Sequence, residues 1–318
     1  TSHEIAAEYD NAGLGSDGNR VLSETITKSP DKAAISPLVS YYLGSFTAVL
    51  DDKSKAKEYR RQAMLQSPEY VFPFQSEVIN VLKSAIAADP KDGHAMYYLG
   101  NLLYDWQPEE AIALWKHSAE VDPNFAITWR NLAIAHAHQT NAGSQKEAIA
   151  DLEKAVSFPN PYPTHFAELD RLYQAAGTPV EKRLAVLEKN EKTIVRNDEA
   201  LGSLINLKTF SGKPADAIAL LKGRTFSIWE GGSIFNTGQA WADACLVRGQ
   251  QLYREKKYKE AIEDFQSALN PPESLRAEQR HDLHNTQIIY WLGCAYNAAG
   301  EKGKAKDEWN KIVSSDIL

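Results

Sequence analysis

The recurrence of small and large residues at a fixed spacing constrains this fold more than any other feature of the sequence. Gly100 is followed by Ala111, by the ring of Trp115 and then by Pro123. Related patterns recur around Gly44, Ala133, Gly249 and Gly293. Self-similarity at a period of about three dozen residues predicts a chain built from one small supersecondary unit, used many times.

The residue types at these positions indicate two packed helices in each unit. A glycine or alanine in the first helix lets the second helix approach, and the rings of Trp115, Phe265 and Trp309 are expected to fill the space between successive pairs. Proline ends the second helix because it has no amide hydrogen and disfavours helix in the residue before it. A lone pair cannot bury its apolar stripe, so stacked pairs must share one core.

This pattern resembles the tetratricopeptide repeat, a helix–turn–helix unit of about 34 residues. The resemblance implies an all-α fold, a right-handed α-solenoid of such pairs, over residues 1–318 as a single array. The pairs are expected near 2–28, 36–67, 94–122, 125–158, 163–190, 198–222, 238–270 and 286–315.

Three segments depart from the regular pattern. A single helix is expected at 77–89, where the proline-broken aromatic stretch 70–74 replaces its partner. In the pair at 163–190, Asp170 takes the small-residue position. The connections 223–237 and 271–286 are longer than the repeat needs, and long loops in a compact fold are more often functional.

Several strings extend the resemblance beyond the generic repeat. They are SPEYVFP at 67–73, YYLGNLLYD at 97–105, WRNL at 129–132, ELD at 168–170, WEGG at 229–232 and YWLGCAY at 290–296. Together they are similar to the C-terminal repeat half of a bacterial family whose N-terminal domain has no known function. The resemblance implies a fragment of a longer protein with a preceding β-rich part, and it implies no particular reaction.

Charge and composition exclude several classes of function. Lys and Arg number 35 against 42 Asp and Glu, a net charge of −7, whereas a nucleic-acid-binding surface is basic. No apolar run approaches the roughly 18 residues of a membrane helix. Two cysteines, Cys245 and Cys294, are too few for a disulfide scaffold and are interpreted as buried thiols. We therefore expect a soluble protein, and the resemblance implies a bacterial one, with its compartment, cytoplasmic or exported, left open.

Three motifs that could suggest a cofactor or a metal are interpreted structurally. The segment 13–18 matches G-x-G-x-x-G, but a dinucleotide site needs a strand before it, and a helix-like stretch precedes it here. His136 and His138 are two apart on a helix and do not face each other. His281 and His284 have no third ligand nearby. We expect no cofactor, no metal and no catalytic residue.

The face formed by the first helices carries the candidate ligand-binding residues. Tyrosine, tryptophan, asparagine and arginine combine rigid contact area with directed hydrogen bonds, which is typical of binding surfaces. For Tyr98 and Trp291, packing inside the repeat is an equal alternative. The candidates are His94, Tyr97, Asn101, Tyr104, Asp105, Arg130, Asn131, Glu168, Arg171, Asn206, Tyr290 and Trp291.

The long connections add loop candidates: Trp229, Glu230, Gly231, Gly232, His284 and Asn285. The segment 226–232 is interpreted either as a hydrophobic plug over its junction or as a contact for a ligand or another domain. Glu230 with Asp105 or Glu168 would form a carboxylate pair of the kind that glycosidases use.

These residues predict a non-catalytic interaction or scaffolding module that binds a peptide, or a partner domain such as the preceding one, in its concave groove. The alternative is an accessory part of a larger carbohydrate-acting enzyme, which supplies groove and loop residues to a glycan site. A third hypothesis is self-association through the end of the chain, 309–318.

Overall fold

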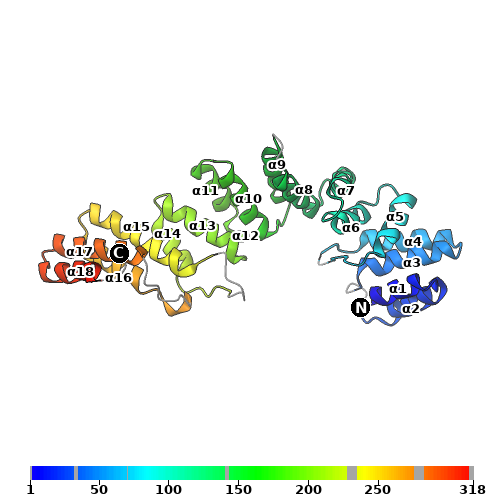
Figure 1. Ribbon diagram of the computed structural model, residues 1–318, viewed down its shortest axis with the longest axis horizontal. Coiled ribbons are helices and arrows are strands. Elements are labelled where there is room, and N and C mark those ends of the chain that lie inside the picture. Colours follow the sequence, from blue (N-terminus) through cyan, green and yellow to red (C-terminus); the bar gives the residue numbers. More distant parts are fainter. Residues whose placement is uncertain are drawn as a thin grey trace. The chain divides into compact units, whose positions relative to one another are not determined.

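The computed structural model describes residues 2–31, 35–69, 71–139, 143–227, 235–275 and 283–314. The regular structure in these ranges consists of 18 α-helices and one short 3-10 helix, Glu273–Leu275 (Figure 1). The predicted all-α fold is confirmed. The chain divides into two compact units, Thr1–Pro159 and Asn160–Leu318. A single array over the whole chain stays a prediction.

The first unit consists of helix pairs and one single helix. Helices α1 and α2, α3 and α4, α6 and α7, and α8 and α9 pack against each other, while α5 packs against α3 and α6. Their bounds are α1 Ser2–Asn11, α2 Gly15–Lys28, α3 Pro37–Val49, α4 Lys53–Leu65, α5 Val78–Ala88, α6 Gly93–Leu103, α7 Pro108–Val121, α8 Ala126–His138 and α9 Ser144–Val156.

The second unit repeats this arrangement with one additional short helix. Helices α10 and α11, α13 and α14, α15 and α16, and α17 and α18 form the pairs, and α12 is a single turn between two of them. Their bounds are α10 Pro163–Ala175, α11 Val180–Lys189, α12 Glu191–Ile194, α13 Asp198–Phe210, α14 Pro214–Leu221, α15 Thr237–Arg254, α16 Tyr258–Leu269, α17 Leu283–Ala298 and α18 Lys302–Ser314.

Glycine in the first helix and a large ring in the second form the close contact of three pairs. A Cβ added to Gly100 would lie 2.7 Å from Trp115 Cδ1, and one added to Gly293 would lie 2.7 Å from Trp309 Cδ1. Gly249 has the same relation to Phe265. Each of these rings lies against the glycine of its own pair. Phe265 also stacks on Trp291 of the following pair with ring centroids 6.4 Å apart, as the sequence spacing predicted.

In the pair α13–α14 the ring comes from a loop. Helix α14 has eight residues, and the side chain facing Gly202 is Phe235, whose Cδ2 would lie 2.5 Å from an added Cβ. Phe226 packs on Phe235 with ring centroids 5.4 Å apart. Phe226 and Phe235 are thus buried against each other, while the hydrophobic-plug interpretation of the segment 226–232 stays a prediction. Trp229, Glu230, Gly231 and Gly232 lie outside the described residues.

Charged side chains replace the ring in the pair α10–α11 and its neighbours. Asp170 is buried and accepts hydrogen bonds from Arg183 Nε at 2.8 Å and Nη2 at 2.9 Å.

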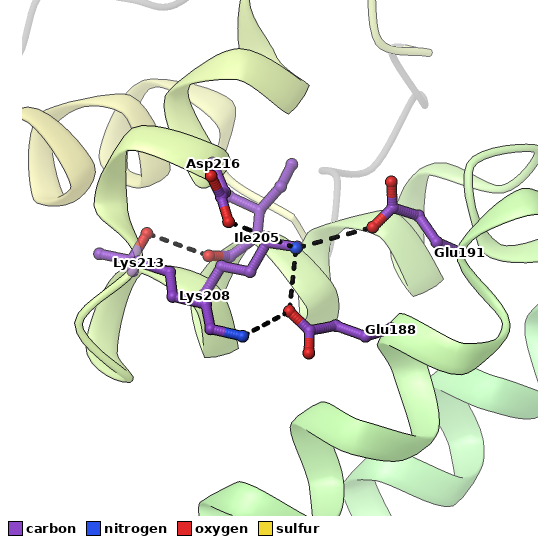
Figure 2. Close-up of polar contacts among 7 residues, drawn as sticks. Glu188, Glu191, Ile205, Lys208, Lys213 and Asp216 are labelled. Carbon is purple, nitrogen blue, oxygen red and sulfur yellow. Dashed lines mark hydrogen bonds and ion pairs between the residues drawn. The ribbon is translucent and has the colours of Figure 1, made fainter.

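On α13, Lys208 has a side chain only 8 % exposed, and its ammonium lies among three carboxylates (Figure 2). The distances from Lys208 Nζ are 3.1 Å to Glu188, 3.6 Å to Glu191 and 3.9 Å to Asp216. This cluster connects α11, α12, α13 and α14.

The glycine-rich segment, His136 and Cys245 lie in ordinary structural positions, whereas His281 lies outside the described residues. Gly13 lies in the turn between α1 and α2 and has φ +69°. The element that precedes the glycine-rich segment is therefore a helix, whereas a dinucleotide site needs a strand there. His136 is buried, and its Nδ1 lies 2.7 Å from Asp151 Oδ2. Burial raises the pKa of the Cys245 thiol to about 12. Among the helices that the structure describes, none combines the length and apolarity that crossing a membrane requires.

Candidate functional site

The first unit contains a pocket of about 380 Å³ beside its third and fourth pairs. It is built by the first helices α6 and α8, by one ring from α7 and by the segment between α4 and α5. Its lining residues are Phe72, Pro73, Tyr97, Asn101, Tyr104, Asp105, Trp115, Ile127, Arg130, Asn131 and Ile134.

Local sequence signals fix the helices that carry these side chains. Asp92 caps the start of α6 by accepting a hydrogen bond from the backbone N–H of Ala95 at 2.9 Å. Pro108 begins α7 at a position where its missing N–H costs nothing, and two glutamates follow in the first turn. Gly100 then allows α7 to approach α6, which brings Trp115 to the pocket.

Two asparagines from consecutive pairs meet in the pocket. Asn131 Nδ2 on α8 donates to Asn101 Oδ1 on α6 at 2.8 Å. The same Asn101 oxygen accepts from Trp115 Nε1 at 3.2 Å, which fixes the orientation of this amide. Asn131 therefore binds Asn101 through Nδ2, and its side chain also lines the pocket.

The polar side of the pocket also carries two tyrosines and two opposite charges. Burial raises the pKa of Tyr97, while a hydrogen bond with Asn101 and the charge of Arg130 act in the opposite direction. Burial and the charge of Asp105 raise the pKa of Tyr104. Both hydroxyls are therefore neutral near pH 7. One arginine and one aspartate leave the pocket without a net charge.

The apolar side comes from α8 and from the segment that replaces a helix. Ile127 and Ile134 stand on α8, and Phe72 and Pro73 belong to the non-helical stretch before α5. The side chain of Phe72 is 72 % exposed. Trp106, next to the lining residue Asp105, is 86 % exposed. The pocket thus offers amide and hydroxyl groups beside aliphatic and aromatic surface.

Six of the predicted site residues line this one pocket: Tyr97, Asn101, Tyr104, Asp105, Arg130 and Asn131. His94, on the same helix α6, does not line it. The imidazole of His94 packs against the ring of Phe125 with centroids 5.1 Å apart, and burial lowers its pKa.

The remaining candidates belong to the second unit. Glu168 and Arg171 lie on α10, where Arg171 forms an ion pair with Glu199 of α13. Asn206 is exposed on α13. Tyr290, Trp291 and Asn285 lie on α17, and Trp291 packs edge-on against Tyr253 at 5.5 Å between centroids. The side chain of His284 lies outside the described residues.

Sequence reasoning missed Phe72, Pro73 and Ile127 as pocket residues, and it assigned the lining residue Trp115 to packing alone. The stretch 70–74 had been identified as irregular, but repeat spacing assigns inward positions only to helices. The available signal was its composition, since two phenylalanines beside a proline have no place in the helical pattern.

Comparison with known proteins yields no matching family model. Solved structures similar to this chain include YrrB, a TPR protein with an unusual peptide-binding site, at 16 % identity over 73 % of this chain and 90 % of that chain, with a TM-score of 0.33. MamA is 15 % identical over 67 % of this chain and 97 % of its own chain, with a TM-score of 0.34. A tetratricopeptide repeat protein from Parabacteroides merdae ATCC 43184 is 14 % identical over 93 % of this chain and 98 % of its own chain, with a TM-score of 0.37.

Proposed function

We propose that the first unit is a non-catalytic interaction module whose pocket holds an extended peptide segment of a protein partner. The observation that carries the proposal is the hydrogen-bonded pair of Asn101 and Asn131 on the first helices of consecutive pairs. A side-chain amide can donate to and accept from a peptide group, and this pair is oriented before any ligand arrives.

The size and chemistry of the pocket support a peptide in preference to a folded domain. A volume of about 380 Å³ is at the lower end of ligand sites and suits one or two side chains with their backbone. Apolar and polar groups lie side by side, as a peptide requires. The preceding part of a longer protein, or a separate protein, could supply such a segment.

Selection from a random peptide library followed by calorimetric titration tests the proposal. The wild-type chain should enrich a peptide that the combined variant Arg130→Ala plus Asn131→Ala binds at least about tenfold more weakly, because a buried amide contact and a charge are removed. Asn206→Ala is the matched control, since it removes an exposed asparagine from a first helix outside the pocket. Equal binding by wild type and the combined variant would contradict the proposal.

A second candidate is a glycan surface that assists a carbohydrate-acting enzyme. The exposed ring of Trp106 beside Asp105 favours it, because sugars stack on accessible aromatic faces. Titration with soluble polysaccharides should then show binding that Trp106→Ala abolishes and Asn131→Ala leaves in place. Binding of no polysaccharide by the wild type would exclude this candidate.

A further inference from the structure

The segment 71–75 stands where a repeat would have its first helix, before α5. Its side chains alternate in burial, as expected for extended backbone. Val71 is buried, whereas Phe72 is 72 % exposed and Phe74 is 69 % exposed. Two large rings thus face outward from one short segment, but only Phe72 is a lining residue of the pocket.

The surroundings of Phe72 hold it in place without covering it. Val71 belongs to the core of the first unit. Pro73, the next residue along the chain, has a restricted φ and lines the same pocket. The backbone on both sides of Phe72 is therefore restrained, so that little backbone entropy remains to be lost when a ligand binds there.

The chemistry next to Phe72 defines what can cover it. Ile127 and Ile134 add aliphatic surface to the pocket, and the opposite charges of Asp105 and Arg130 give it no net charge. An apolar ligand side chain would gain from burial against these aliphatic and aromatic groups.

We propose that Phe72 is a specificity-determining residue of this pocket, which selects peptides that place an aromatic or large aliphatic side chain against its ring. This inference rests on the proposed function. The Asn101–Asn131 pair would hold the peptide backbone whatever its sequence, and Phe72 would set the preference for one side chain.

The test uses the full chain and a phage-displayed library of random peptides. Wild type should enrich peptides that share one aromatic or large aliphatic position. A synthetic peptide of that consensus should bind Phe72→Ala about tenfold more weakly, because an aromatic contact is lost. Phe74→Ala is the matched control, as a similarly exposed ring of the same segment that does not line the pocket. It should bind like wild type, and Phe72→Leu should recover part of the affinity.

A double-mutant cycle separates selection from general weakening. Replacing the apolar consensus residue of the peptide by alanine should weaken binding to wild type about tenfold and have little further effect on Phe72→Ala. If binding depends on Asn131 but shows no coupling to Phe72, the inference is wrong and the proposed function stands. If wild type enriches no peptide, or Asn131→Ala binds the consensus peptide equally well, both are wrong.

Discussion

The pairs α6–α7 and α10–α11 bury the same helical position with different side chains. In α6–α7, Gly100 lies against the ring of Trp115. In α10–α11, Asp170 stands at that position and is bonded twice by Arg183. The contrast shows that repeat spacing fixes where two helices make their closest contact, while the chemistry of that contact varies from pair to pair.

The energetic terms in the two pairs differ accordingly. A glycine against a ring gains from apolar burial and dispersion, which require only that the shapes fit. A buried ion pair must offset the lost hydration of both charges, so it is sensitive to the removal of one partner. This difference predicts how each pair responds to substitution.

The largest expected effect is in the ring-filled pair. Trp115→Ala should lower the free energy of unfolding by about 3–5 kcal/mol, because it leaves a large cavity against Gly100. Urea denaturation followed by circular dichroism measures the change. An unaltered denaturation midpoint would show that this ring does not hold the pair together.

The ion pair should show a comparable loss that a second substitution repairs. Asp170→Ala should destabilise the chain by about 3 kcal/mol, because it strands the charge of Arg183, whose side chain is 12 % exposed. Adding Arg183→Met should recover much of the loss by removing that charge. The same urea denaturation assay measures the free energy of unfolding of both variants. A double variant as unstable as Asp170→Ala alone would show that a stranded charge is not the cause.

Two glycine substitutions compare a helix with a loop as the source of the ring. Gly100→Ala should cost about 1–3 kcal/mol, since Trp115 is held by its own helix. Gly202→Ala should cost less, about 1 kcal/mol, because Phe235 stands on a connection outside the helices. Thermal melts of the two variants side by side provide the measurement, and the reverse order would contradict this explanation.

The smallest effect concerns pH. A hydrogen bond from Lys213 lowers the pKa of Glu188 below its ordinary value of 4.5, and a hydrogen bond from Lys208 acts in the same direction. A carboxyl group with a lowered folded pKa contributes stability above its unfolded pKa and loses it as pH falls through the folded value. Glu188→Gln should therefore flatten the decline in stability below pH 4.5, by less than about 1 kcal/mol. Identical acid unfolding curves would remove Glu188 from this role.

The helices and half of the pocket could be predicted from the sequence for a common physical reason. Helical periodicity determines which residues share a face, so the Leu-Gly signature places Tyr97 and Asn101 on one side of α6 and Asn131 on the matching side of α8. These are relations between residues a few turns apart or one repeat apart.

The parts that could not be predicted depend on contacts without a period. Phe235 reaches Gly202 from a long connection, and nothing in the local sequence states which glycine it will face. Phe72 lies in a segment with no helical register at all. The short helix α12 and the carboxylates around Lys208 depend likewise on how neighbouring pairs meet.

The asparagine pair is the proposed contact point for a peptide, and nuclear magnetic resonance with isotope-labelled asparagine measures this contact directly. Titration of the library-selected peptide should shift the side-chain amide signals of Asn101 and Asn131 in proportion to binding and leave those of Asn206 unchanged. If saturating peptide leaves the Asn101 and Asn131 amide signals where they were and shifts signals elsewhere in the chain, the pair is not the peptide contact and the proposed function is wrong.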